Sequence, residues 1–380
     1  MKKASIIFNS PYLGGAERSI IIQTSKLSCN YFIPYFKNEN ECENIVLNIK
    51  EYSNSDIYYF KYPEYLFSIS RTSFFFNPVL ILRDLFVLKK SVVEIIKQTD
   101  LIWCNGNKVA LIFLIFNKLF FYNKKIIWHF RDYPSSNILY RFIWSFIAVF
   151  TNKNELFLAN SKSVEHDIQK KFYNLVNTDF VYNPIGNLNI AKDNSTFNGR
   201  IGIVSMIAPW KGLTEISNWA NTNTEFLHKL GINEICIYGS DIYKTKGEHS
   251  NYFNLLKSEI NKNNKSLVRL MGLEDPCNIY KNIDILIHCS VQREPFGRVI
   301  VEAASCNIPV ISTGLGGAGE LIELIGAYKY DYLNSKSLKR IIDDIILYKG
   351  FKGYKADFYS WDENILKKID FILSKCMILG

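Results

Sequence analysis

The amino-acid sequence predicts an α/β protein with two doubly wound parallel sheets. The chain starts with a short apolar strand, a loop that contains Gly14 and Gly15, and an apolar-periodic helix. Strand-like and helical segments then alternate through both halves of the chain, which is typical of parallel sheets. A polar segment separates the two series. We therefore expect two units, with ligands bound at the carboxyl ends of the strands in a cleft between them.

The first unit is expected over residues 1–185. Residues 3–8 are apolar except for Lys3 and Ser5, and they predict a strand that is buried on both faces. The loop over 9–15 leads into a helix that continues to Leu27. Further strands are predicted at 101–104, 125–129, 156–159 and 179–182.

The second unit is expected over residues 186–355. Residues 184–199 are polar and rich in Asn, Gly and Ser, as domain linkers are. The strands predicted after this linker are 200–204, 234–238, 268–270, 283–287 and 308–311. Residues 361–373 predict an amphipathic helix, and we expect residues 356–380 to pack back across the joint onto the first unit.

Composition excludes several classes of protein. Of the 380 residues, 48% are hydrophobic and 21% charged, which is too apolar for a disordered chain. The longest uncharged stretch, 303–319, contains Pro309 and four glycines, so it cannot be a membrane-spanning helix. The apolar run after Met1 is broken by Asn9 and Pro11, so we expect no secretory signal and a cytoplasmic protein. The eight cysteines show no paired spacing, so neither disulfides nor a zinc site are expected.

The net charge of +9 lies mainly in the first half of the chain. Residues 61–141 hold 12 basic and 5 acidic residues, interleaved with aromatic and aliphatic ones, as in 71–76 and 119–125. This pattern fits two interpretations equally, an anionic membrane surface or a buried helix with a solvated lysine face. Nucleic acid is disfavoured as a partner, because no recognisable binding module accompanies the basic residues.

The most informative motif is Glu-Pro-Phe-Gly-Arg-Val-Ile-Val-Glu at 294–302. Pro295 and Gly297 predict a turn, followed by a helix that starts near Arg298 and ends at Asn307. A carboxylate accepts two hydroxyl hydrogen bonds at once, so Glu294 and Glu302 could each bind a vicinal diol. The free amides at the helix start suit an anion or a hydroxyl. The motif therefore predicts sugar recognition; two surface glutamates would not explain its turn–helix–strand context.

At this motif the chain resembles the retaining glycosyltransferases of the GT4 class, which have the GT-B fold of two Rossmann-like domains facing a central cleft. Their signature is written EPFG…E, and the pair Glu294 and Glu302 matches its spacing. Four other segments are similar to family motifs in the same order along nearly the whole chain: Gly14–Arg18, Asn183–Ile185, Trp210–Gly212, and Gly316–Gly317 with Glu320.

The resemblance implies transfer of a hexose from a nucleotide diphosphate sugar to a glycan or lipid-linked acceptor, in cell-surface polysaccharide or glycoconjugate synthesis. It implies that Glu302 holds the ribose and that Lys211 neutralises the departing diphosphate. The donor sugar would contact Glu294, Pro295, Phe296 and Gly297, with Gly14 and Gly15 near the diphosphate. His129 would touch the reaction centre, and Arg131 and Asn105 the acceptor. No metal is expected, since the lysine and the helix amides would neutralise the diphosphate in its place. The membrane partner would be the anionic inner face of a membrane.

One position departs from the family pattern. The family commonly has an arginine five residues before this lysine, where this chain has Met206. A thioether cannot donate to a phosphate. Either Arg293 or Arg298 supplies the charge, or donor binding is weaker, or catalysis is lost; we favour the first. Two other functions remain open: a sugar-nucleotide epimerase of the same fold, and a non-catalytic partner subunit.

Overall fold

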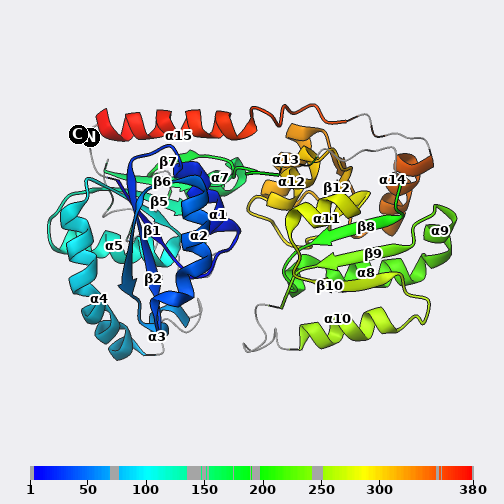
Figure 1. Cartoon of the computed structure of the whole chain (residues 1–380), viewed down its shortest axis with the longest axis horizontal. Helices are drawn as coiled ribbons and strands as arrows, with labels where there is room; N and C mark the ends of the chain where they lie inside the picture. Colours follow the sequence, from blue (N-terminus) through cyan, green and yellow to red (C-terminus); the bar gives the residue numbers. More distant parts are fainter. Residues whose placement is uncertain are drawn as a thin grey trace. The chain divides into compact units, whose positions relative to one another are not determined.

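The structure is a computed structural model. It describes residues 4–68, 77–134, 147, 151, 154–173, 175–188, 190, 197–241, 251–347, 351 and 353–378. The basic aromatic segment 71–76 and part of the predicted linker, 189 and 191–196, lie outside the described residues. The chain divides into two compact units, residues 1–184 with 362–380 and residues 185–361 (Figure 1).

The first unit is built on a seven-stranded parallel sheet in the order β3-β2-β1-β4-β5-β6-β7. The strands are β1 (Ala4–Phe8), β2 (Cys29–Tyr35), β3 (Asp56–Lys61), β4 (Leu101–Asn105), β5 (Lys125–Phe130), β6 (Glu155–Ala159) and β7 (Asn177–Phe180). Strands β1 and β4 are buried at every position, as expected for a central strand covered on both faces. The strand order reverses between β1 and β4, which is where such sheets bind ligands.

Helices cover both faces of this sheet (Figure 1). They are α1 (Gly15–Thr24), α2 (Glu43–Tyr52), α3 (Glu64–Ser68), α4 (Pro78–Gln98), α5 (Asn107–Leu119) and α7 (Lys162–Lys171), with a 3₁₀ turn η1 (Glu39–Cys42). The core against one face is aromatic: the Trp128 ring lies 5.1 Å from Phe130 and 5.3 Å from Phe157. Helix α4 begins at Pro78, with the Asn77 side chain accepting from the Leu80 amide at 3.3 Å.

The second unit is built on a six-stranded parallel sheet in the order β10-β9-β8-β11-β12-β13. Its strands are β8 (Arg200–Val204), β9 (Glu234–Tyr238), β10 (Val268–Gly272), β11 (Ile285–His288), β12 (Val310–Ser312) and β13 (Tyr328–Lys329). Its helices are α8 (Leu213–Thr222), α9 (Thr224–Lys229), α10 (Tyr252–Asn261), α11 (Pro276–Asn282), α12 (Arg298–Ser305), α13 (Gly317–Ile325) and α14 (Ser335–Leu347), with a 3₁₀ turn η2 (Pro209–Lys211). The predicted fold class, two doubly wound α/β sheets, is confirmed.

The last helix, α15 (Trp361–Ile378), belongs to the first unit from Asp362 onward. Its apolar face, which includes Ile365 and Ile369, is buried. The Lys368 ammonium lies 3.2 Å from Asp179 and over the Phe180 ring, so the helix is fastened to β7. The final segment of the chain is therefore part of the first unit.

All eight cysteines are free thiols. Within the ranges given above, no three His, Cys, Asp or Glu side chains form a group that could hold a metal ion. Nor does any helix in the described part of the chain have the length and apolarity needed to cross a membrane.

Candidate functional site

The candidate site in the second unit lies at the carboxyl edge of its sheet, where the strand order reverses between β8 and β11. Three loops leave this edge, after β8, β11 and β12. They carry Lys211, Glu294 and Gly316 respectively. The parallel sheet therefore brings together residues that are far apart in the sequence.

Lys211 is positioned by a close contact between two backbones. Gly212 has φ 68°, and a Cβ at this position would lie 2.1 Å from the Cys289 carbonyl oxygen. Only glycine can follow the lysine here. The Val291 amide also donates to the Trp210 carbonyl at 3.0 Å. The Trp-Lys-Gly sequence thus fixes the lysine against the segment that follows β11.

Glu294 makes hydrogen bonds through both its backbone and its side chain. Its amide donates to the Leu315 carbonyl at 3.0 Å, and its carbonyl accepts from the Gly317 amide at 2.7 Å. On the side chain, Glu294 Oε2 lies 2.5 Å from Lys211 Nζ and accepts from Ser290 Oγ at 3.1 Å. The carboxylate and the ammonium thus form a partly buried ion pair at the carboxyl edge.

His288, which ends β11, was not predicted as a site residue. Its Nε2 lies 3.5 Å from Glu294 Oε2, and its Nδ1 lies 3.0 Å from Ser312 Oγ at the end of β12. The Ser312 oxygen also accepts from the Gly314 amide at 3.1 Å. A histidine at the end of a buried strand, six residues before Glu294, was the available signal.

The surroundings of Glu294 favour its ionised form. Burial by itself raises the pKa of this carboxyl group, but the hydrogen bond from His288 and the charge of Lys211 outweigh it. The net effect holds the pKa of Glu294 well below its usual range. The group is therefore a carboxylate, an acceptor without a proton, at neutral pH.

Glu302 lies on α12 and is almost fully buried. Tyr280 OH donates to its Oε2 at 2.8 Å, and Arg298 approaches its Oε1 through Nε at 3.0 Å and Nη2 at 2.8 Å. Burial raises the pKa of Tyr280, and the Glu302 charge raises it further, so the phenol stays a donor. Tyr280 was not predicted as a site residue. Arg298, which is predicted to bind the donor, pairs with Glu302 in the structure.

The turn between the two glutamates requires a glycine. Gly297 has φ 94°, and a Cβ there would lie 2.9 Å from Ile300 Cδ1. The side chain of Phe296 is buried in the structure. Helix α12 starts at Arg298 as predicted, but it ends at Ser305, before Asn307 with φ 58°.

The first unit holds the other group of predicted residues, at the carboxyl edge of its own sheet. Gly14 and Gly15 follow β1 at the start of α1. The Gly14 amide donates to Glu17 Oε2 at 3.2 Å, so this amide already has a hydrogen-bond acceptor on α1. Burial raises the pKa of Glu17, in spite of the nearby Arg131 charge.

Arg131 and Asn105, both predicted to contact the acceptor, lie together. Arg131 donates to Asn105 Oδ1 from Nε at 2.7 Å, to Asn183 Oδ1 from Nη1 at 2.8 Å and to Gln23 Oε1 from Nη2 at 3.1 Å. Gln23 donates in turn to the Tyr182 carbonyl at 3.0 Å. The guanidinium therefore joins β4, β5, α1 and the segment after β7; the roles of Gln23 and Asn183 were not predicted.

His129 has no exposed surface in the structure. Its Nδ1 accepts from Trp103 Nε1 at 3.2 Å, and its Nε2 has no hydrogen-bond partner among the described residues. Burial, and to a smaller extent the Arg131 charge, lower the pKa of His129 well below its usual range. The imidazole is neutral, and because Nδ1 accepts, Nε2 carries the proton.

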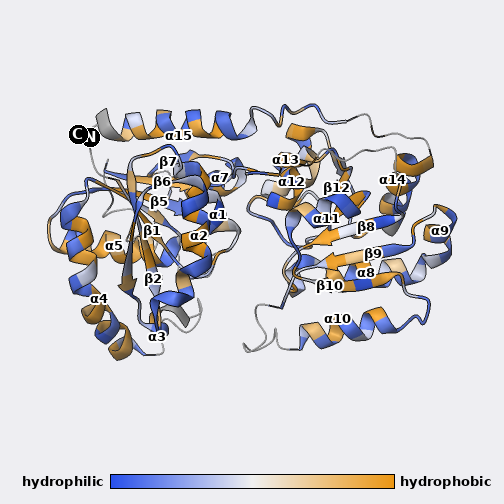
Figure 2. Ribbon diagram, in the orientation of Figure 1, coloured by the Kyte–Doolittle hydropathy of each residue, from blue (hydrophilic) through white to orange (hydrophobic). Residues whose placement is uncertain are grey.

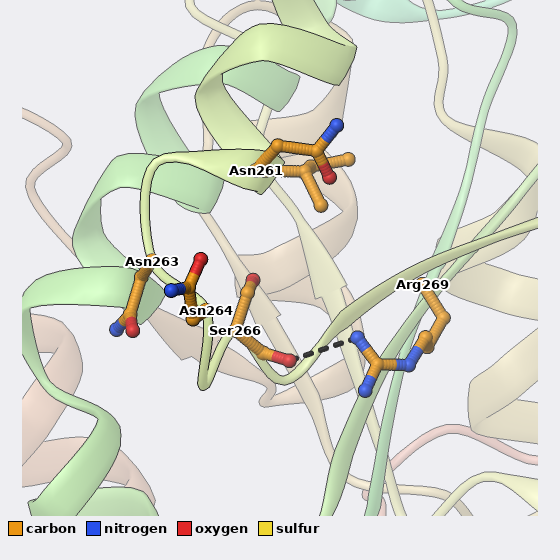
Figure 3. Close-up of a pocket in the computed structure, with 6 residues that line it drawn as sticks. Asn261, Asn263, Asn264, Ser266 and Arg269 are labelled. Carbon is orange, nitrogen blue, oxygen red and sulfur yellow. Dashed lines mark hydrogen bonds between the residues drawn. The ribbon is translucent and has the colours of Figure 1, made fainter.

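A surface hollow of about 320 Å³ lies elsewhere in the second unit (Figure 3). It is lined by Ile260, Asn261, Asn263, Asn264, Ser266 and Arg269. Arg269 Nη1 donates to the Ser266 carbonyl at 2.8 Å. The hollow lies between the end of α10 and the start of β10, at the amino end of the strand. None of the predicted site residues lines it.

Part of the chain is similar to known glycosyltransferases. Residues 201–353 match the family model of glycosyl transferases group 1. An uncharacterised glycosyltransferase of Methanocaldococcus jannaschii is 36% identical over 100 residues, and the capsular polysaccharide biosynthesis glycosyltransferase CapM of Staphylococcus aureus is 25% identical over 152 residues. These alignments cover 24% and 40% of this chain, and 25% and 32% of the length of the curated relatives.

Solved structures match the whole chain. HepE of Anabaena, crystallised with UDP and glucose, is 21% identical with a TM-score of 0.74, covering 98% of this chain and 100% of its own. A glycosyltransferase of Rickettsia africae is 17% identical with a TM-score of 0.70, covering 100% and 97%. The fold is thus the GT-B fold of glycosyltransferases. The match of residues 201–353 to the model of glycosyl transferases group 1 lies within the second unit, and at that level it agrees with the resemblance predicted from the motif of Glu294 and Glu302.

Proposed function

We propose that the chain is a retaining glycosyltransferase that moves a hexose from a nucleotide diphosphate sugar to a glycan or lipid-linked acceptor. The observation that carries this proposal is the ion pair of Lys211 and Glu294, at the reversal point of a group 1 glycosyltransferase domain. The names of similar proteins support the sugar chemistry: CapM is a capsular polysaccharide biosynthesis glycosyltransferase, and HepE was crystallised with UDP-glucose. Synthesis of a cell-surface polysaccharide or glycoconjugate fits both.

Lys211 would stabilise the leaving diphosphate. In a retaining transfer, negative charge builds on the departing phosphate while positive charge builds on the sugar. An ammonium has three N–H donors, so its contact with Glu294 leaves capacity for phosphate oxygens. We propose that this lysine, the amides at the start of α12 and one nearby arginine neutralise the diphosphate without a metal ion.

The two glutamates would divide the donor between them. Glu294 is ionised and accepts hydrogen bonds, so it suits the hydroxyls of the sugar. Glu302 would take the ribose hydroxyls, because Tyr280 and Arg298 fix its carboxylate while lone pairs remain on both oxygens. Since the Phe296 side chain is buried, this residue and its neighbours Pro295 and Gly297 would contribute through their backbone.

The first unit would bind the acceptor. The three amide contacts of Arg131 hold its guanidinium in one orientation at the carboxyl edge, where it would meet an acceptor phosphate beside Asn105. Gly14 and Gly15 would allow the backbone to approach the donor diphosphate. His129 would reach the reacting sugar through Nε2, and this requires that the burial of its ring be relieved when substrates bind.

A thermal-shift screen against UDP, GDP, ADP and their sugars tests the donor class. A ligand bound only by the native state at a hundred times its Kd stabilises that state by about 2.7 kcal/mol. Stabilisation by one nucleotide and its sugar, lost in Lys211→Ala, is the expected result. No shift with any of them would contradict the proposal and favour a non-catalytic partner subunit.

Product analysis separates transfer from epimerisation. An epimerase converts the nucleotide sugar without a second substrate, whereas a transferase releases the nucleotide when the sugar moves to an acceptor or, more slowly, to water. Incubation with the stabilising donor should give slow release alone and faster release with a glycan or lipid-linked acceptor. An isomerised nucleotide sugar as the product would favour the epimerase. Unchanged activity after chelation with EDTA is expected, and loss of activity would contradict metal independence.

A further inference from the structure

The outer face of α4 exposes a stripe of large apolar side chains. Val79, Leu82, Phe86 and Val87 are 71%, 67%, 77% and 53% exposed. Their spacing of three, seven and eight residues from Val79 places them on one side of the helix. The other side of α4 packs into the core through Ile81, Leu88 and Val92. The first half of the helix is therefore apolar on both sides, and folding of the unit accounts for only one of them.

The end of α5 extends this stripe. Leu119 and Phe121 are 63% and 91% exposed, and Phe120 lies between them. The Lys89 ammonium of α4 lies 5.2 Å from the centre of the Phe120 ring, so the two segments adjoin. Figure 2 shows hydrophobic residues along both α4 and α5. We call Val79, Leu82, Phe86, Val87 and Leu119–Phe121 the apolar face.

Basic residues outnumber acidic ones on the segments that carry the apolar face. Residues 77–124 contain seven basic and three acidic residues. On α4, Arg83, Lys89, Lys90 and Lys97 are all exposed. One of the three acids, Asp84, is buried and paired with Arg83 at 2.7 Å. The exposed surface of α4 thus combines bulky apolar groups with an excess of ammonium groups.

We propose that the apolar face docks onto the surface of an anionic lipid bilayer. Amphipathic helices with Leu and Phe beside Lys bury their apolar side chains at the boundary of headgroups and acyl chains, while each ammonium attracts lipid phosphate. Charge complementarity decides the choice of occupant. A second copy of this chain would bring the same lysines and arginine against this surface, and like charges repel. The docking uses no residue of the proposed donor site, and it would bring a lipid-linked acceptor to the protein.

Vesicle cosedimentation of the full chain tests the docking without donor or acceptor. Wild type should bind vesicles of phosphatidylglycerol and phosphatidylcholine at low salt, bind less at high salt, and show little binding to pure phosphatidylcholine. The variant Leu82→Ser/Phe86→Ser should lose about tenfold or more in affinity. Lys89→Gln/Lys90→Gln should weaken binding and flatten its salt dependence. Leu273→Ser/Leu333→Ser is the matched control, since both side chains are about 80% exposed in the second unit.

The outcomes separate lipid from protein partners. Indifference of wild type to anionic vesicles at both salt concentrations would overturn the proposal. So would an equal loss of binding in the control variant. A dimer in sedimentation velocity that Leu82→Ser/Phe86→Ser dissociates would assign the face to a second copy instead. Far-ultraviolet circular dichroism verifies that each variant is folded, and Val79→Ser, an independent change of the same stripe, should also reduce vesicle binding.

Discussion

Lys211 Nζ lies 2.5 Å from Glu294 Oε2, although the two residues are 83 positions apart in the chain. Their side chains are only 13% and 17% exposed. In such surroundings each charge depends on the other, because an uncompensated charge away from water is costly. The pair holds an ammonium at the carboxyl edge of the sheet, where the donor diphosphate is proposed to bind.

Removing the ammonium should therefore affect both stability and activity. Lys211→Met should lower the free energy of unfolding by about 2 kcal/mol. This loss is smaller than the loss expected for a fully buried pair, because both side chains are partly exposed to solvent. It should lower kcat by about 10²- to 10³-fold, the usual effect of losing one electrostatic donor. Urea unfolding and steady-state kinetics measure the two effects. The double variant Lys211→Met/Glu294→Gln should recover stability but not activity; recovery of both would contradict a role for the lysine in transfer.

The depressed pKa of Glu294 predicts how stability depends on pH. The folded-state pKa lies below the unfolded value of about 4.3, so the contribution of the ionised carboxyl is fully present above that value. It is lost as the pH falls below about 4. The difference in unfolding free energy between wild type and Glu294→Gln should thus be constant from pH 7 to 5 and shrink at lower pH. Chemical denaturation across this range measures it, and a difference independent of pH would contradict the ion pair.

His288 should act as a positioning residue for Glu294. Its hydrogen bond is one reason that the pKa of Glu294 is low, so His288→Leu should let that pKa rise. The acidic limb of the profile of kcat/KM against pH should then move to higher pH, with activity reduced about tenfold, or 1.4 kcal/mol. His288→Gln keeps an N–H donor and should retain most of the activity. Equal effects of Leu and Gln, with an unmoved limb, would indicate packing alone.

Met206 stands where the family commonly has an arginine. Mutation can identify which other arginine supplies that positive charge. Arg298→Ala or Arg293→Ala should raise the donor KM or lower kcat, because one of them is expected to contact the diphosphate. Arg298 also holds Glu302, so its removal should weaken ribose binding as well. Tyr280→Phe is the control, since it removes the other hydrogen bond of Glu302 and keeps both arginines. Kinetics like those of wild type in both arginine variants would eliminate the hypothesis.

Strands with a mainly apolar run could be predicted from the sequence, whereas two strands whose apolar run is interrupted were missed. Strand β1 was predicted from its apolar run, and every residue from Ala4 to Phe8 is buried. Strand β3 was missed because it lies at the edge of the sheet and exposes four of its six residues. Strand β2 was missed although it is almost wholly buried, because Pro34 interrupts its pattern.

The candidate site also has features that the sequence could reveal and features that it could not. The spacing of Glu294 and Glu302 is local, so the sequence could reveal it. The contacts of His288 with Ser312, and of Tyr280 with Glu302, join different elements through the order of the strands and helices. No pattern along the chain encodes that order directly. The pairing of Arg298 with Glu302 is an i,i+4 contact on α12, so the predicted start of this helix at Arg298 was the signal that could have revealed it.

The amide contacts of Arg131 predict a separation of acceptor and donor effects. Arg131→Lys keeps the positive charge but cannot bridge Asn105, Asn183 and Gln23 in the same planar geometry. We expect the KM for a phosphorylated acceptor to rise about tenfold, or 1.4 kcal/mol, while the thermal shift with the donor nucleotide is unchanged. Initial-rate kinetics with each substrate varied in turn measure the first effect. A rise in the KM for the donor instead would contradict this prediction. It would indicate that Arg131 contacts the nucleotide sugar, and that residues of both units bind the donor.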